Sequence, residues 1–221
     1  MKNIVLCAVI LAVFLGGANA FAVGNNVADL TNSYVYCPAT YVKGIYDEGP
    51  RSILGGAPIG HKTSLLLWRW DDEPGKDRAF TEVALAHRVN EHLDLGFVRD
   101  AWVGDNTELS ANAVVDLRSK YVSLGMLIPT NGNGTIQYGP RVQLAPNLVG
   151  YATASEGTNP LFGLGKYGKK LNLDVTVGTD RWYFRASTPI PCKYGTFRPE
   201  LRLRKVGDET FVGFGLLFIA K

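Results

Sequence analysis

The side chains of this sequence that could carry acid–base chemistry near neutral pH are its histidines, His61, His87 and His92. A hydrolase or a lipid-modifying enzyme would need such a histidine beside a hydroxyl nucleophile or an acidic partner. The local combinations of this kind are His61-Lys62-Thr63-Ser64, and His92 with Asp94 or Asp100. Neither combination has a diagnostic spacing, so we predict no catalytic residues and rank an enzyme as the third hypothesis.

Cofactor and metal sites are equally poorly supported by the sequence. The histidines show neither His-x-His nor His-x-x-x-His spacing, which a local metal site would need. Gly163-Leu164-Gly165-Lys166-Tyr167-Gly168 fits the G-x-G-x-x-G pattern, but no alternation of strands and helices surrounds it, as a dinucleotide site requires. The net charge of +3, with basic and acidic residues interspersed, gives no reason to expect a nucleic-acid partner.

Residues 1–20 have the features of a secretory signal peptide. Lys2 provides a charged start, Ile4 to Phe14 form an apolar run, and Ala18-Asn19-Ala20 is a small-x-small cleavage site. We therefore predict export and cleavage after Ala20. No later stretch offers the roughly 20 apolar residues of a membrane helix, so a membrane-spanning form of this chain would have to be a closed barrel of strands.

Export determines how the cysteines are interpreted. Cys7 would leave with the signal peptide, and Cys37 and Cys192 would remain in an oxidising compartment. We predict a disulfide between Cys37 and Cys192 that joins the N-terminal segment to a late turn. Two independent free thiols are the alternative.

The elements that must position these side chains alternate with a period of two residues from Ser64 onward, which predicts β-strands. In 79–89, for example, Val83 and Leu85 oppose Glu82 and Arg88. Turn residues separate the segments, and no segment of helical period competes in the exported chain. The predicted strands are 64–70, 79–89, 93–103, 107–118, 121–129, 135–145, 148–155, 171–178, 181–188, 196–205 and 209–219, and 160–167 could supply one more.

These segments predict an all-β fold, a closed antiparallel transmembrane β-barrel of about 12 strands, with about 10 or 8 as alternatives. The expected organisation is a signal peptide at 1–20, a periplasmic N-terminal segment at 21–62 with one short strand at Ser33–Tyr36, and the barrel at 63–221. An even strand number would bring Cys192 to the same end of the barrel as the N-terminus, within reach of Cys37.

Alternation alone leaves open which face of the strands meets water. A soluble lipocalin-like barrel turns its apolar face inward to bind an apolar ligand, whereas a membrane barrel turns that face outward to lipid. The soluble barrel is the second hypothesis. Aromatic residues near the predicted strand ends suit the interfacial girdles of a membrane barrel. They are Trp68, Trp70, Tyr121, Trp182 and Phe211.

In the last predicted strand, from Phe211 to Lys221, large apolar side chains alternate with glycine. This strand resembles the terminal strand that bacterial outer-membrane barrels present to their insertion machinery. The runs from Val89 to Gly96 and from Leu144 to Tyr151 look like the hairpins of porin-like outer-membrane proteins. The resemblance covers residues 64–220 and implies a barrel in the outer membrane of a Gram-negative bacterium, with the lipid bilayer and the insertion machinery as partners.

With the apolar face outward, the charged face would line the lumen. The implied function is passive: a porin-like channel for small polar or charged solutes, or a structural barrel whose lumen is filled by ion pairs. Acidic residues come mainly from the earlier strands and arginines mainly from the later ones, so we expect opposed arcs of charge. The candidate lining residues are Glu82, Arg88, Asp94, Asp100, Glu108, Asp116, Arg118, Arg141, Asp174, Arg181, Arg185, Arg198, Glu200, Arg202 and Arg204.

Overall fold

The computed structural model describes residues 30–31, 34–47, 51–71, 79–103, 108–131, 134–155 and 157–221. The signal peptide expected at 1–20, its cleavage position and Cys7 lie outside the described residues. In the part of the chain that is described, no helix is long and apolar enough to cross a membrane.

The described chain folds into fifteen β-strands, each antiparallel to its neighbours. The alternation of side chains from Ser64 onward correctly predicts most of them. Their bounds are β1 Tyr41–Asp47, β2 Arg51–Pro58, β3 Thr63–Asp71, β4 Ala79–Asn90, β5 Leu93–Val103, β6 Glu108–Arg118, β7 Val122–Pro129, β8 Gln137–Ala145, β9 Leu148–Ser155, β10 Leu161–Tyr167, β11 Asn172–Val177, β12 Arg181–Ser187, β13 Ile190–Cys192, β14 Gly195–Val206 and β15 Glu209–Ala220.

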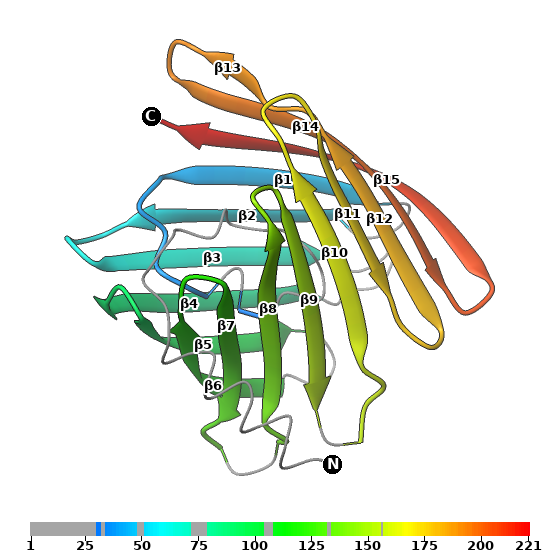
Figure 1. Cartoon of the computed structure of the whole chain (residues 1–221). Coiled ribbons are helices and arrows are strands. Elements are labelled where there is room, and N and C mark those ends of the chain that lie inside the picture. The colour runs from blue at the N-terminus through cyan, green and yellow to red at the C-terminus, as the bar shows by residue number, and fades with distance from the viewer. Residues whose placement is uncertain are drawn as a thin grey trace.

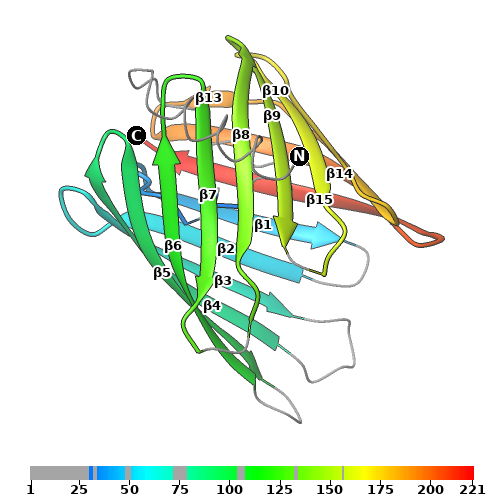
Figure 2. The ribbon, with the colours of Figure 1, turned by 60° about the horizontal axis from the view of Figure 1, so that its bottom comes forward.

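The sheet closes on itself as a barrel (Figures 1 and 2). Strands β1 to β12 pair in sequence, β12 pairs with β14, β14 with β15, and β15 with β1, which makes a ring of fourteen strands. The short strand β13 also pairs with β14 and continues the edge of β12 beyond a break after Ser187. A closed antiparallel barrel is therefore confirmed.

The expected number of about 12 strands is wrong, because the barrel begins earlier than expected. Strands β1 and β2 occupy residues 41–58, so the boundary expected between 62 and 63 falls too late. Their glycines, Gly44 and the pair Gly55-Gly56, interrupt the apolar alternation that identified the other strands. The short strand expected at Ser33–Tyr36 is also wrong for Tyr34 to Tyr36, which form a turn and bend; Ser33 lies outside the described residues.

The two ends of the barrel differ in the connections they carry. We call the end where β1 begins and β15 ends the terminal rim; its connections are 59–62, 91–92, 119–121, 146–147, 168–171 and 188–194. There the Ala220 N–H donates to the Thr40 carbonyl at 2.8 Å. We call the opposite end the loop rim. Gly207, in the β14–β15 turn at the loop rim, has a φ of 58°, which favours glycine.

The two faces of the wall have opposite polarity. Large apolar side chains on the outer face are exposed, for example Val83 at 40% and Phe214 at 60%. Charged side chains on the inner face are buried, for example Glu82 at 2% and Asp116 at 0%. The apolar face therefore points outward, which is the orientation of a membrane barrel and the reverse of a lipocalin-like one.

Some of the aromatic residues expected at the interfaces lie on the inner face instead. Trp68 packs against a small apolar cluster of β3 to β6 that includes Leu66 and Ala84. Phe211 lies under the guanidinium group of Arg204, with the carbon of that group 4.5 Å from the ring centroid. These side chains shape the interior, so they are no evidence for the girdles.

The disulfide expected between Cys37 and Cys192 is absent, and both thiols are free. The Cys37 N–H donates to Ser64 Oγ at 3.2 Å, which holds Cys37 beside β3, whereas Cys192 pairs with Gly195 of β14. Strands β2, β1 and β15 separate β3 from β14, and a disulfide needs Cα atoms within about 7 Å. Burial also raises the pKa of the Cys37 thiol, which lowers its thiolate fraction.

We predict that the exported protein, unfolded without reductant, takes up alkylating reagent at both Cys37 and Cys192. Intact mass spectrometry would count the added groups, and a prereduced sample gives the reference value. If the protein gains no alkyl groups without reductant but gains them after reduction, the disulfide forms after all.

Candidate functional site: the charged inner wall

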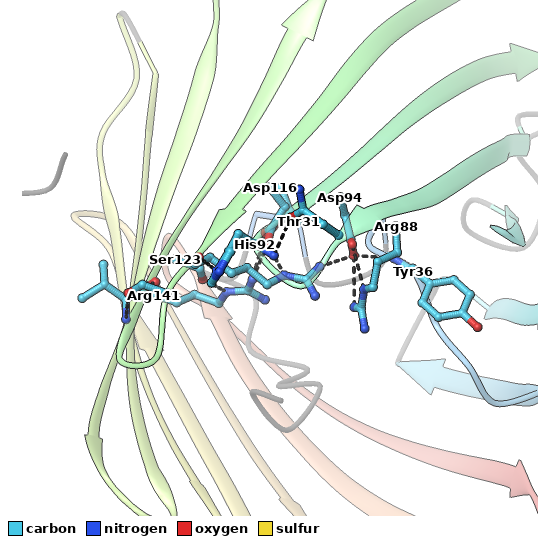
Figure 3. A network of polar contacts seen from close by, with 12 residues as sticks. Thr31, Tyr36, Arg88, His92, Asp94, Asp116, Ser123 and Arg141 are labelled. Carbon is cyan, nitrogen blue, oxygen red and sulfur yellow. Dashed lines mark hydrogen bonds and ion pairs between the residues drawn. The ribbon is translucent and has the colours of Figure 1, made fainter. Parts of the chain in front are cut away.

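Two aspartates form the centre of a polar network on the inner face of β4 to β8 (Figure 3). Asp94 of β5 and Asp116 of β6 lie opposite each other in the ladder, and their exposed fractions are 1% and 0%. Two adjacent buried carboxylates require cationic partners. Arg118 contacts both of them, with its Nε 2.6 Å from Asp116 Oδ1 and its Nη2 bonded to Asp94 Oδ2.

Arginines from the flanking strands complete the neutralisation. Arg141 of β8 donates from Nη2 to both oxygens of Asp116, at 3.0 and 2.8 Å, and from Nε to Ser123 Oγ at 2.6 Å. Arg88 of β4 donates from Nε to Asp94 Oδ1 at 2.9 Å. Three guanidinium groups and two carboxylates from four strands therefore form one continuous chain of ion pairs, to which β7 adds the hydroxyl of Ser123.

The described residues before β1 extend into the barrel and are bonded to this network. We call these residues, 30–31 and 34–40, the inner segment. Thr31 Oγ1 donates to Asp116 Oδ2 at 2.6 Å, and the Tyr36 N–H donates to Asp94 Oδ2 at 2.9 Å. The carbon of the Arg88 guanidinium group lies 5.0 Å from the centroid of the Tyr36 ring. The inner segment thus occupies interior space next to β4 to β8 (Figure 3).

Inward-facing glycines make room for the inner segment. A Cβ at Gly125 would lie 2.4 Å from Thr31 Cγ2, and one at Gly139 would lie 2.8 Å from Leu30 Cβ. A Cβ at Gly96 would lie 3.2 Å from the Tyr34 carbonyl oxygen. Strands β5, β7 and β8 therefore each present a position without a side chain where the segment passes, the close approach that glycine within a strand permits.

A second polar network lies on the inner face of β1, β12 and β14. Glu200 is 5% exposed, and its Oε1 forms an ion pair with Lys43 Nζ at 2.7 Å. Arg185 Nη1 lies 3.8 Å from Glu200 Oε2, and Arg202 Nε lies 4.0 Å from Glu200 Oε1. Gly215 of β15 leaves the room that the Glu200 side chain fills, since a Cβ there would lie 2.6 Å from Glu200 Cγ.

Asp174 of β11 extends the second network toward β9. Its Oδ2 accepts a hydrogen bond from Arg185 Nε at 3.0 Å, and its Oδ1 accepts one from the Tyr167 hydroxyl. The Tyr151 hydroxyl donates to that of Tyr167 at 3.0 Å. Arg185 is therefore shared between two carboxylates, Asp174 and Glu200.

Strand β14 carries more positive charge than its neighbours neutralise. The Nε atoms of Arg198 and Arg204 are buried and, among the described residues, have no hydrogen-bond partner. The Arg204 guanidinium group instead stacks on Phe211. Together with Lys43, Arg185 and Arg202, these arginines face only two carboxylates, those of Asp174 and Glu200, in the described part of this wall.

The opposite excess occurs on β4 and β5. Glu82 and Asp100 lie opposite each other in the ladder, so two acidic side chains are adjacent on the inner face. Glu82 Oε2 accepts a hydrogen bond from the Tyr34 hydroxyl at 3.0 Å, and Asp100 Oδ2 accepts one from Ser110 Oγ at 3.0 Å. The remaining oxygens, Glu82 Oε1 and Asp100 Oδ1, are buried without a partner in the described chain.

The structure places the predicted charged residues unevenly between the expected arcs. Arg141, expected in the basic arc, belongs to the network of Asp116, and Arg88 and Arg118 are also paired on the acidic side. Arg181 lies at the loop rim, paired with Asp180 at 2.9 Å. The side chain of Glu108 lies outside the described part. The inner face carries Glu82, Arg88, Asp94, Asp100, Asp116, Arg118, Arg141, Asp174, Arg185, Arg198, Glu200, Arg202 and Arg204.

Sequence reasoning missed Lys43 and the inner segment, because residues 21–62 were expected to lie outside the barrel. A signal was present in the strands themselves. Gly96 and Gly139 occupy positions on the charged face of their strands, where glycine indicates that another backbone approaches closely. Gly125 follows Ser123 on the inner face of β7, a strand without charged residues, so the sequence offered no such signal there.

The structure does not bring His61 together with Ser64, or His92 together with Asp94. His61 is exposed at the terminal rim, whereas Ser64 is buried on the inner face. His87 is exposed on the outer face, where its Nδ1 lies 2.9 Å from Thr63 Oγ1. His92 is exposed at the terminal rim next to Glu91, whereas Asp94 points inward. No group of three or more His, Cys, Asp or Glu residues in the described chain could hold a metal ion.

No protein-family model matches this chain, and no curated protein matches it. Among solved structures, it is similar to the KdgM porin, with 11% identity, a TM-score of 0.45, and coverage of 81% of this chain and 98% of that one. A structure of the KdgM porin in complex with disordered oligogalacturonate gives 10% identity, a TM-score of 0.44 and the same coverage, 81% and 98%. Both scores lie below 0.5, so the barrel and the polarity of its faces are established by the strand pairing and burial described above.

We predict that Gly125→Val displaces the inner segment, because the new side chain would overlap Thr31. Hydrogen–deuterium exchange should become faster at the amides of Tyr34 to Tyr36, because the hydrogen bonds from the Tyr34 N–H to the Thr31 carbonyl and from the Tyr36 N–H to Asp94 are then weakened. Gly44→Val is the matched control, since a Cβ at Gly44 meets no atom within 4 Å. Equal exchange in the two variants would contradict the packing of the segment against β7.

Proposed function

We propose that this protein is an outer-membrane β-barrel that acts as a passive channel for small polar or charged solutes. The observation that carries the proposal is the polarity of the closed ring, which is apolar outside and charged inside. A membrane-spanning sheet must pair every backbone group, and a closed ring of strands does so. We also infer that β15, with its alternating glycines, is the strand presented to the insertion machinery.

The outer surface supports the membrane placement. On β3 to β5 the exposed Leu67, Leu85 and Phe97 form an apolar band. Polar residues border that band on both sides: Thr63 and His87 toward the terminal rim, and Arg69 toward the loop rim. Exposing such an apolar band to water costs free energy, whereas contact with lipid tails does not.

The inner surface favours a channel over the two other barrel hypotheses. A lipocalin-like barrel would need an apolar interior, but the interior here carries buried Asp94, Asp116 and Glu200. A barrel of about 8 strands can be filled by its own side chains, and one of about 16 leaves an aqueous channel. A ring of fourteen strands lies near the wider limit. The inner segment narrows it on the side of β4 to β8.

The excess of arginines over carboxylates on the described inner wall of β12 and β14 supports a preference for anions. Arg198, Arg202 and Arg204 lie along one inner strand, and the Nε atoms of Arg198 and Arg204 have no hydrogen-bond partner among the described residues. A lining with excess positive charge raises the local concentration of anions and lowers that of cations. Passage would therefore follow the wall of β12 and β14, opposite the inner segment.

We predict that the purified protein in planar lipid bilayers gives a conductance that rises with salt and prefers anions. Changing Arg198, Arg202 and Arg204 together to Gln should move the reversal potential in a salt gradient toward that of a cation-selective pore. The control variant Arg69→Gln/Arg99→Gln removes outward arginines and should leave the reversal potential unchanged.

Two outcomes would revise the proposal. Absence of conductance from a folded, inserted barrel would favour the structural barrel with a filled lumen. An unchanged reversal potential in the triple variant would show that β14 does not line the conducting path.

We predict that Val175→Arg impairs folding into lipid by about 2–4 kcal/mol if Val175 lies near the midplane of the bilayer, because the new charge would face lipid tails. Val175 is 42% exposed on the outer face of β11. The control Leu171→Arg places the same charge in a turn of the terminal rim, where the cost is about 0–1 kcal/mol. Denaturant titration of the barrel in vesicles measures both, and equal stabilities would refute the outward placement of Val175.

A further inference from the structure

The terminal rim carries a ring of exposed lysines. Lys62, Lys120, Lys169, Lys170 and Lys193 occupy four of its connections, and all five side chains are exposed. These connections follow β2, β6, β10 and β12, so the lysines are spread around the barrel. In the described connections of this rim the one carboxylate is that of Glu91, which lies next to His92.

The loop rim has no comparable excess of positive charge in its described connections. Arg181 is paired there with the neighbouring Asp180, with Nε and Oδ1 separated by 2.9 Å. Asp208 in the β14–β15 turn and Glu209 at the start of β15 are exposed, and Lys205 lies on the paired strand opposite Thr210. Among the connections that the structure describes, the excess of lysines is therefore found at the terminal rim.

Lys166 connects this rim with the apolar outer surface. It is exposed on the outer face of β10, where it follows the exposed Phe162 and Leu164 in the alternation. Tyr167, the next residue, ends the strand at the terminal rim. A lysine in this position can extend its ammonium group from the apolar surface to the level of the lipid headgroups.

Two tyrosines lie in the connections of the terminal rim. Tyr121 is 54% exposed and Tyr194 is 71% exposed. The Nζ of Lys120 lies 5.0 Å from the centroid of the Tyr121 ring, and that of Lys193 lies 5.5 Å from the centroid of the Tyr194 ring. Tyrosine prefers the interface between lipid tails and water, so these contacts hold two of the ammonium groups beside that interface.

We propose that the lysine rim, defined as Lys62, Lys120, Lys166, Lys169, Lys170 and Lys193, binds the headgroup phosphates of anionic phospholipids. The inference rests on the membrane placement proposed above. Beside transmembrane helices, clusters of 4–8 Lys or Arg residues indicate binding of anionic lipid, and we extend that electrostatic argument to the end of a barrel. Here the lipid would belong to the leaflet next to the terminal rim, and it would help to fix the depth and orientation of the barrel.

The test uses the full exported chain, refolded in a neutral detergent, with phosphatidylglycerol or phosphatidylcholine added. Native mass spectrometry counts the lipids retained by the folded barrel. We expect preferential retention of phosphatidylglycerol, and about tenfold weaker retention in a variant with all six rim lysines changed to Gln. A variant with the same lysines changed to Arg keeps the charge and should retain phosphatidylglycerol as the unmodified protein does.

Equal retention of the two lipids by the unmodified protein would overturn the inference, as would full retention of phosphatidylglycerol by the Gln variant. If the Gln variant does not fold, the comparison of the two lipids on the unmodified protein still decides. Heat-modifiable gel mobility in detergent is measured first, because it shows whether the protein folds as a membrane barrel. If it does, loss of selective lipid retention counts against the lysine rim and not against the proposed function. A protein that is monodisperse without detergent would refute the membrane placement itself.

Discussion

Closure of the strand ring is the constraint on which the rest of this structure depends. An open sheet of this length would leave a row of unpaired N–H and C=O groups at each edge. The pairing of β1 with β15 removes both edges at once. Only because the backbone is satisfied within the wall can the outer face be given over to apolar side chains and the inner face to charged ones. Glu82 and Val83 are an example: they are adjacent in sequence, but Glu82 is buried on the inner face and Val83 is exposed on the outer face.

Closure also determines how the interior charges must be arranged. Charged side chains that point into the ring lose most of their contact with water, so each carboxylate needs a cationic or hydrogen-bonding partner nearby. Asp94 and Asp116 obtain these partners from three arginines and from the inner segment. Glu200 obtains them from β1, β12 and β14. The arginines of β14 outnumber the carboxylates near them, so positive charge remains on this strand. That remaining charge is the part of the interior that can attract a solute anion.

Much of the wall, but little of the interior, could be predicted from the sequence. Alternation in 79–89 and in 107–118 reveals both the strand and its charged face, because the period of a strand is a local property. Strands β1 and β2 were missed because glycine weakens that pattern. One partner of β1, the strand β15, also lies at the other end of the chain. Ion pairing depends on register between strands: that Asp94 lies opposite Asp116 follows from the turn between β5 and β6, not from either strand alone. The expected disulfide failed for the same reason, since a shared rim does not specify a position around the ring.

The position of the inner segment has a consequence for the order in which the barrel assembles. Thr40 leads directly into β1, and the residues before it are bonded to β3 through β6 from the inside. The seam between β1 and β15 joins the strands that are farthest apart in the chain, so its formation carries a large loop-closure entropy. We therefore expect the seam to form last, after the wall of β3 to β8 has offered its glycine positions to the segment. If the segment were still outside when the seam forms, it would have to enter through one end of the closed ring. It would then pass interior arginines that are already paired with Asp94 and Asp116.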